Sequence, residues 1–243
     1  MLVDSDAGGA LHTATLNAPI PAPGKLGLAD DYWEDFLCMV LYVPDTGVPH
    51  VSCTYTGLAF GFTGGNLGGI TVSAVAQPGL TPGLTVAPFM RSMLYDALSL
   101  RGALDLVESS EYPVQNITLV IGDGRNERRA AKVRFDSEGN MKNKRYDLAW
   151  TDFYLKKPGI VFDASGNRDT LRQLLSGDIN ALDFSKVVST AATRPVAALG
   201  GNLMNVVYDF TGYDFVVYVA IARNGREAFQ DYLDHVSIQD LLP

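Results

Sequence analysis

Two cysteines and three histidines are the side chains of this sequence best suited to nucleophilic chemistry or metal binding. Cys38 and Cys53 stand in apolar, alternating segments and form no CxxC pair, so we expect buried free thiols, with a disulfide as the less favoured alternative. Two thiols and three scattered histidines do not make a metal-ligand set. The sequence therefore predicts no metal and no cofactor.

Cys53 is the one side chain that could act as a relocated nucleophile, because it precedes a glycine-rich run. A thiol on an alternating strand is more often packed in the core, and no histidine stands at a spacing that predicts a base for it. We expect His50 and His235 in turns or at the surface, and His12 within the first strand pair. The histidines therefore predict no catalytic dyad.

The glycine-rich run over residues 57–69 has two interpretations. Glycines let a backbone approach a phosphate closely, as in phosphate-binding loops. The run lacks the Lys and Ser/Thr of a P-loop, and strands are predicted on both sides of it, whereas phosphate loops open a helix. Tight turns between strands, with one at residues 64–66, are the favoured interpretation.

The elements that must position these residues follow from the apolar periodicity. Strands are predicted over 1–4, 10–16, 36–43, 48–55, 58–63, 70–76, 116–121, 130–135, 203–210 and 215–222. Helices are predicted from 85 to 98 and over 100–108, 168–175, 184–192 and 226–233, with Ser99 and Asp183 as N-caps. Helix pairs set between antiparallel hairpins favour an α+β fold of two face-to-face sheets with helices outside.

Composition narrows the function classes. The 243 residues suit one domain over 1–243, and no apolar run approaches the roughly 20 residues that span a bilayer. The first residues do not resemble a secretory signal, and the compartment stays open. A net charge of -8 argues against nucleic acid as a partner. The densest basic stretch, 125–145, interleaves cations with acids and is predicted to be a solvated hairpin.

Four segments in order resemble one family. Residues 9–17 (GALHTATLN) are similar to the strand that follows the nucleophile in the Ntn hydrolases of the penicillin acyltransferase and choloylglycine hydrolase group. Residues 56–73 (TGLAFGFTGGNLGGITVS) resemble that group's strand, turn and strand, and this match is the most specific. Residues 88–124 and 202–242 fit more loosely. The resemblance implies a four-layer αββα sandwich with two packed antiparallel sheets.

The resemblance also implies chemistry that this chain does not carry. The family uses an N-terminal Cys whose thiol attacks an amide carbonyl while its own α-amine acts as base. The matching nucleophile position falls at or just before Met1, and Met cannot attack. Where the pattern has a cation and a carboxylate, this chain has Ala14 and Asn17. Asn66 matches the family's structural and oxyanion-side Asn, whereas a later family Asn would fall near 147–152, where no Asn stands.

Two functional interpretations follow from the resemblance. In the first, the chain is an impaired amide hydrolase or acyltransferase homologue that acts in binding or assembly, with a small acyl-amide ligand or a second copy of itself as the expected partner. In the second, the chain is an active C–N amide hydrolase or acyltransferase whose Cys lies upstream of Met1 or on a separate chain. The combined absence of a nucleophile, a cation and a carboxylate favours the first.

Overall fold

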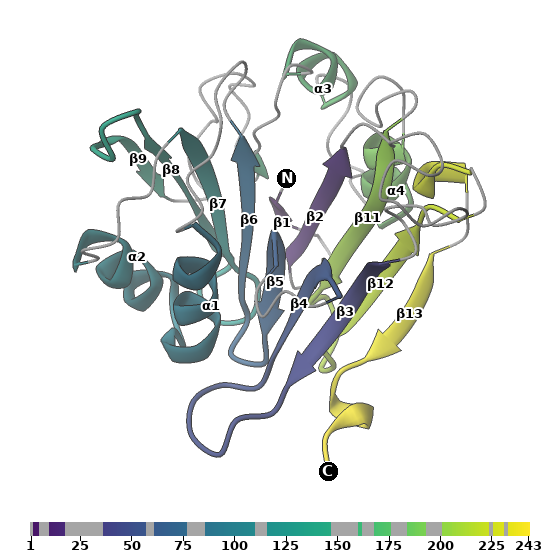
Figure 1. Ribbon diagram of the computed structural model, residues 1–243, viewed down its shortest axis with the longest axis horizontal. Coiled ribbons are helices and arrows are strands. Elements are labelled where there is room, and N and C mark those ends of the chain that lie inside the picture. Colours follow the sequence, from purple (N-terminus) through teal and green to yellow (C-terminus); the bar gives the residue numbers. More distant parts are fainter. Residues whose placement is uncertain are drawn as a thin grey trace, which may run out of the picture.

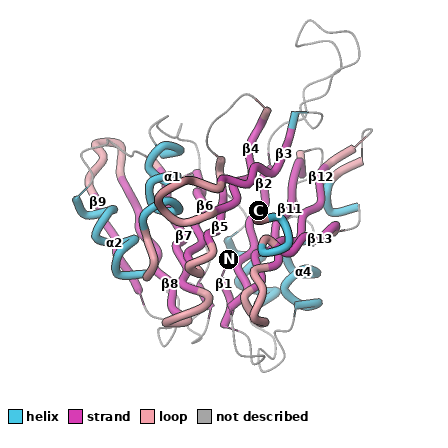
Figure 2. The backbone as a smooth tube through the Cα atoms, turned by 90° about the horizontal axis from the view of Figure 1, so that it is seen from below, coloured by secondary structure: helices cyan, strands magenta, loops and turns pink. Residues whose placement is uncertain are grey.

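The computed structural model describes residues 2–4, 10–17, 36–56, 61–76, 86–109, 116–146, 160–161, 168–175, 184–192, 201–223, 226–230 and 233–243. Two antiparallel sheets form the centre of the molecule, with helices on their outer sides (Figures 1 and 2). The predicted α+β class and αββα layering are confirmed. Over the described residues, no helix is both long and apolar enough to cross a membrane.

The first sheet has six strands in the order β10-β1-β2-β11-β12-β13. The strands are β1 (Leu2–Asp4), β2 (Ala10–Asn17), β10 (Ile160–Val161), β11 (Asn202–Asp209), β12 (Val216–Ile221) and β13 (Asp234–Ser237). Strand β2 lies between β1 and β11, so the N-terminal hairpin is near the middle of this sheet. Because side chains alternate along a strand, every second residue of β2 faces the other sheet.

The second sheet is a meander of seven strands, β3 to β9 in chain order. The strands are β3 (Leu37–Tyr42), β4 (His50–Tyr55), β5 (Thr63–Asn66), β6 (Ile70–Ala76), β7 (Ile117–Asp123), β8 (Arg129–Phe135) and β9 (Met141–Tyr146). The two helices α1 (Val86–Asp96) and α2 (Leu100–Ser109) cover its outer face, with α1 over β5 and β6 and α2 over β7 and β8 (Figure 1). Ser99 Oγ accepts from the Gly102 N–H at 3.1 Å, which confirms the predicted N-cap.

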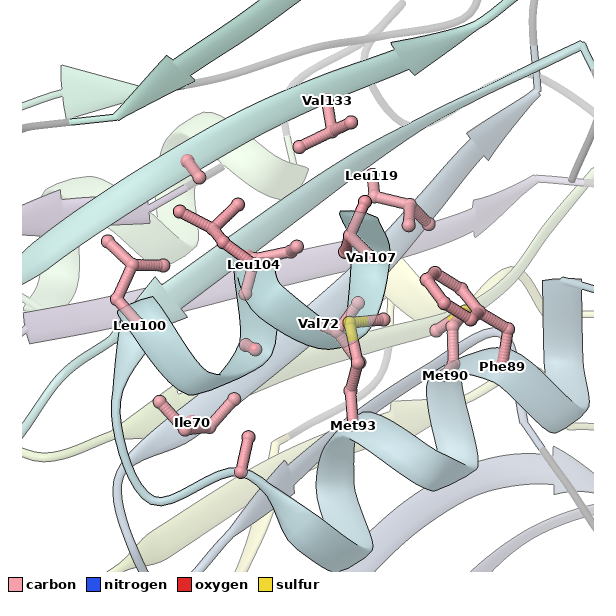
Figure 3. Packing of buried hydrophobic residues seen from close by; sticks show 14 of the residues in the cluster. Ile70, Val72, Phe89, Met90, Met93, Leu100, Leu104, Val107, Leu119 and Val133 are labelled. Carbon is pink, nitrogen blue, oxygen red and sulfur yellow. The ribbon is translucent and has the colours of Figure 1, made fainter. Parts of the chain in front are cut away.

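Each sheet buries its outer face under helices. Under α1 and α2, apolar side chains of the helices and of β6 to β8 form one core, in which Met93, Leu104 and Val72 lie together (Figure 3). On the other side, α3 (Arg168–Leu175) contacts α4 (Phe184–Ala192), and α4 packs on β2 and β11. A second apolar core, which includes Tyr208 and Phe215, fills the space between the sheets. Apolar residues recur every 3.6 positions in a helix and every second position in a strand when one face is buried. This spacing is why the elements could be predicted from the sequence.

Two predicted elements are wrong. Residues 64–66, predicted as a turn, lie in strand β5, and the turn follows at 67–69. Glycine is needed there for close approach: a Cβ at Gly64 would collide with Leu94 of α1, and one at Gly65 would lie 2.8 Å from Phe215 Cζ of the facing sheet. Within the predicted helix 226–233, residues 231 and 232 lie outside the described part, and the described residues form only a 3-10 turn at Ala228–Gln230. Glu227 accepts from the Gly201 N–H at 3.0 Å and the Phe229 N–H donates to Asn202 Oδ1 at 2.8 Å, so tertiary hydrogen bonds override the local helical pattern here.

Candidate functional site

A layer of polar side chains lies between the two sheets, where a core would normally be apolar. His12 of β2 faces this layer and is 1 % exposed. Its Nδ1 lies 2.6 Å from Thr71 Oγ1, and its Nε2 lies 2.8 Å from Ser73 Oγ. Thr71 and Ser73 both belong to β6 of the opposite sheet, so one imidazole joins the two sheets.

The available donors determine the direction of the hydrogen bonds that join His12, Thr71, Ser73 and Thr63. The Thr63 hydroxyl donates to the Val72 carbonyl at 2.9 Å, so Thr63 accepts from the Ser73 hydroxyl, also at 2.9 Å. Ser73 must then accept from Nε2–H of His12, which leaves Nδ1 as the acceptor of the Thr71 hydroxyl. The chain is therefore Thr71 to His12 to Ser73 to Thr63, with a neutral imidazole in its middle.

Burial keeps His12 neutral. Desolvation of the imidazole holds its pKa well below 6.5, because a charged ring would lose its hydration. Strands β2, β4, β5 and β6 contain no Asp, Glu, Lys or Arg. These four strands therefore contribute no charged side chain to the inter-sheet layer around His12.

Cys53 belongs to the same layer, and its thiol is unreactive. Its thiol is fully buried on β4, with Sγ 3.7 Å from Oη of Tyr208, whose ring packs edge-on to His12 at 6.0 Å between centroids. Burial raises the pKa of Cys53 to about 12, and it also raises the pKa of Tyr208 well above 10. A thiol that stays protonated and out of contact with solvent is not a nucleophile at neutral pH. Both cysteines are free, and Cys38 is half-buried.

Leu2 is the described residue next to the position that the resemblance assigns to the nucleophile. Leu2 on β1 pairs with His12 on β2, and Met1 itself lies outside the described residues. Ala14 is half-buried, pairs with Val206 of β11 and shares the inner face of β2 with His12. The sheet thus places a methyl group where the resemblance implies a cation.

The other two family positions lie farther along the sheets. Asn17 is the last residue of β2 and pairs with Asn202. Asn66 is fully buried on the helix-facing side of β5, where its amide nitrogen donates to the carbonyls of Leu94 at 2.9 Å and Ala97 at 2.8 Å. Its oxygen accepts from the Ile70 N–H at 2.9 Å. All of these bonds fasten the end of α1 to the turn before β6, so Asn66 has a structural role and both of its N–H donors are occupied. The stretch at 147–152 lies outside the described residues.

The sequence predicted the exposure of His235 correctly and that of His50 wrongly. His235 is exposed on β13, as expected, but His50 is 1 % exposed at the start of β4 and not a surface residue. Its ring stacks on Tyr42 at 4.9 Å, and Nδ1–H donates to the Val48 carbonyl at 2.8 Å. Burial lowers the pKa of His50. The apolar residues that flank His50 in the sequence predicted a strand there. His50 is buried because helix α1 covers the face of β4 on which it lies, with the Tyr95 ring 6.5 Å from that of His50.

The partners of His12 were missed because they are far away in the sequence. Thr71 and Ser73 stand 59 and 61 residues from His12. The sequence signal that could have found them is the alternation of Thr71 and Ser73 with apolar residues on a strand that is buried on both faces. Buried polar side chains on one face of a central strand need hydrogen-bond partners on the facing sheet.

The basic stretch at 125–145 is a hairpin, since β8 pairs with β9. Arg125 at its start is more than a solvated cation. Its guanidinium donates to the carbonyls of Leu67 at 3.2 Å and Tyr213 at 2.8 Å, and its carbon lies 6.0 Å from the ring centre of Phe210. Arg125 therefore joins a turn of one sheet to a hairpin loop of the other.

Comparisons with known proteins identify the fold. The structure is similar to a Caenorhabditis elegans N-acylethanolamine-hydrolyzing acid amidase ortholog, with a TM-score of 0.65 at 14% identity over 100% of this chain and 98% of that chain. It is also similar to a variant of the conjugated bile acid hydrolase of Clostridium perfringens, with a TM-score of 0.60 at 9% identity over 99% and 92% of the two chains. Penicillin V acylase from Agrobacterium tumefaciens gives 0.53 at 10% identity over 91% and 82%.

These likenesses establish the class of fold, which is that of the Ntn hydrolases, as the sequence resemblance implied. Sequence comparison adds nothing to them: no protein-family model matches the chain, and no curated protein does.

Proposed function

We propose that this chain is an impaired homologue of the Ntn amide hydrolases and acyltransferases, and that it binds a small acyl-amide ligand without cleaving it. The observation that carries the proposal is the inner face of β2, on which Ala14 takes the place that the resemblance gives to a cation, while the facing strands β4, β5 and β6 contribute no charged residue. Amide cleavage in this family needs charged groups beside the attacking thiol, whereas hydrogen bonding to an amide group needs only neutral donors and acceptors.

The remaining candidate groups argue against cleavage. Cys53 is buried, and its pKa of about 12 keeps the thiol protonated. His12 is a neutral base whose Nδ1 is already bound to Thr71. Asn66 spends both N–H groups on helix α1, so it offers no donor to an oxyanion.

The alternative proposal is an active C–N amide hydrolase or acyltransferase with a Cys upstream of Met1 or on a separate chain. Strand β1 supports it, because Leu2, which follows the position that the resemblance gives to the nucleophile, pairs with His12 of β2. The similarity of nearly complete chains, 100% of this one and 98% of the worm amidase ortholog, fits either proposal.

The test combines turnover and binding. Hydrolysis of N-acyl aminocoumarin amides of several acyl lengths would be followed by fluorescence, and binding of the same amides by thermal shift. We expect stabilisation without turnover. The variant Ala14→Leu should weaken the stabilisation because it fills the inner face, whereas Leu98→Ser, at a side chain 62% exposed, should leave it unchanged.

Three other results decide between the proposals. Turnover by the unmodified chain would contradict the proposal of an impaired homologue. A protein from its native source that begins at Cys would support the proposal of an active hydrolase or acyltransferase. Absence of both binding and turnover would contradict a ligand role. If Met1→Cys together with Ala14→Arg and Asn17→Asp gives no turnover, more of the site than these three positions has diverged.

A further inference from the structure

Over the described residues the two sheets have four edge strands, and three of them carry features that block strand pairing. Strand β10 has only two residues, β13 has four and begins with the exposed Asp234 and His235, and β9 carries Lys142, Lys144 and Arg145 in its sequence. Short length and charge are the usual means by which proteins protect sheet edges.

Strand β3 has neither protection. Its six residues, Leu-Cys-Met-Val-Leu-Tyr, contain no charge, no Pro and no Gly. Such a segment is strongly inclined to pair with another strand. Within the part of the chain that the structure describes, β3 pairs with β4 on one side and with no strand on the other.

The register defines which backbone groups point away from β4. The Thr56 N–H donates to the Phe36 carbonyl at 2.6 Å, so the alternate positions 38, 40 and 42 bond to β4. The N–H and C=O groups of Leu37, Met39 and Leu41 then point to the open edge. The side chains of the same three residues belong to the apolar core between the sheets.

We propose that the β3 edge binds the β3 edge of a second copy of this chain, in antiparallel register about Met39. In this register Leu37 pairs with Leu41 of the other copy, Met39 pairs with its own equivalent, and about six backbone hydrogen bonds form. The two seven-stranded sheets become one continuous sheet, and the apolar layer between the sheets continues across the junction.

Charge and symmetry identify a second copy as the occupant. An uncharged strand meets its own copy without like-charge repulsion at the contact, although each chain carries a net charge of -8. The antiparallel pairing has two-fold symmetry, so it closes at two chains. The protected edges at β9, β10 and β13 prevent growth into a longer assembly. This inference does not depend on the proposed ligand binding.

Sedimentation velocity over a concentration series tests the proposal. We expect a concentration-dependent species of about 52 kDa, twice the 26.2 kDa of the chain. The variant Met39→Pro removes an N–H that points to the open edge and leaves the bonds to β4 in place, so it should remain folded and sediment as a monomer. Leu41→Lys adds the charge that β3 lacks and should have the same effect.

Matched controls separate this edge from other exposed apolar groups. Tyr213→Ser and Leu98→Ser change side chains that are 100% and 62% exposed in loops away from β3, and both should leave the dimer intact. Hydrogen exchange adds a residue-level readout: the amides of Leu37, Met39 and Leu41 should be protected only in the dimer, and those of Cys38 and Val40 in both states.

Several results would overturn the proposal. A wild-type chain that stays monomeric at all accessible concentrations has no self-pairing edge. A dimer that persists in folded Met39→Pro and Leu41→Lys variants forms through another surface. Assemblies larger than a dimer contradict the two-fold pairing. Should Met39→Pro fail to fold, Leu41→Lys and the exchange pattern decide the question.

Discussion

Acidification should destabilise the folded chain through His12, and the substitution His12→Gln isolates this effect. Glutamine can accept from Thr71 and donate to Ser73 but has no proton to gain. In the wild type, burial holds the pKa of His12 well below the ordinary value of 6.5 that it regains on unfolding. As pH falls through 6.5, the unfolded chain takes up the proton first, so stability is present above that pH and decreases below it.

The magnitude follows from proton linkage. While the folded state stays unprotonated, each pH unit below the unfolded pKa removes about 1.4 kcal/mol of unfolding free energy. Between pH 7 and pH 5 the loss due to His12 amounts to about 2 kcal/mol. The lowered pKa of His50 acts in the same direction, but His50 is present in both proteins and cancels in the comparison.

Urea unfolding at a series of pH values gives the free energies. Wild type should lose about 2 kcal/mol more than His12→Gln over this interval. The control His235→Gln changes an exposed histidine and should follow the wild-type curve. Parallel curves for wild type and His12→Gln would refute the assigned neutral, doubly bonded imidazole.

Three further predictions test other parts of the fold. Asn66→Ala should lower the unfolding free energy by about 2 to 4 kcal/mol, because it leaves two buried helix carbonyls and one N–H without a partner; urea unfolding measures this. Cys53 should not react with a thiol reagent until the chain unfolds, whereas the half-buried Cys38 should react first, as mass spectrometry of labelled peptides can show. Gly47→Ala should destabilise by about 1 to 3 kcal/mol, since Gly47 has φ +92 and an added Cβ would lie 2.6 Å from Tyr95 Cζ; thermal unfolding measures this.

Local pattern was sufficient for most elements because the apolar period reports which face of a segment is buried. The helix pairs, the N-cap at Ser99 and the strands at β2, β6 and β11 follow from such local signals. Local pattern failed at residues 64–66 and 226–233. At 64–66 glycine serves close packing rather than a turn. At 226–233 hydrogen bonds from Glu227 and Phe229 to residues 201 and 202 outweigh helical propensity.

The sequence by itself determined the α+β class and, through the resemblance, the sandwich layering, whereas the match of Ala14 and Asn17 to the family's charged positions stays a prediction. Only the tertiary structure decided what surrounds His12, which way Asn66 faces and which sheet edge stays open. The physical reason is that periodicity records burial but not partners. A hydrogen bond between residues 59 positions apart exists only once two sheets pack at one register, and that register depends on the whole core.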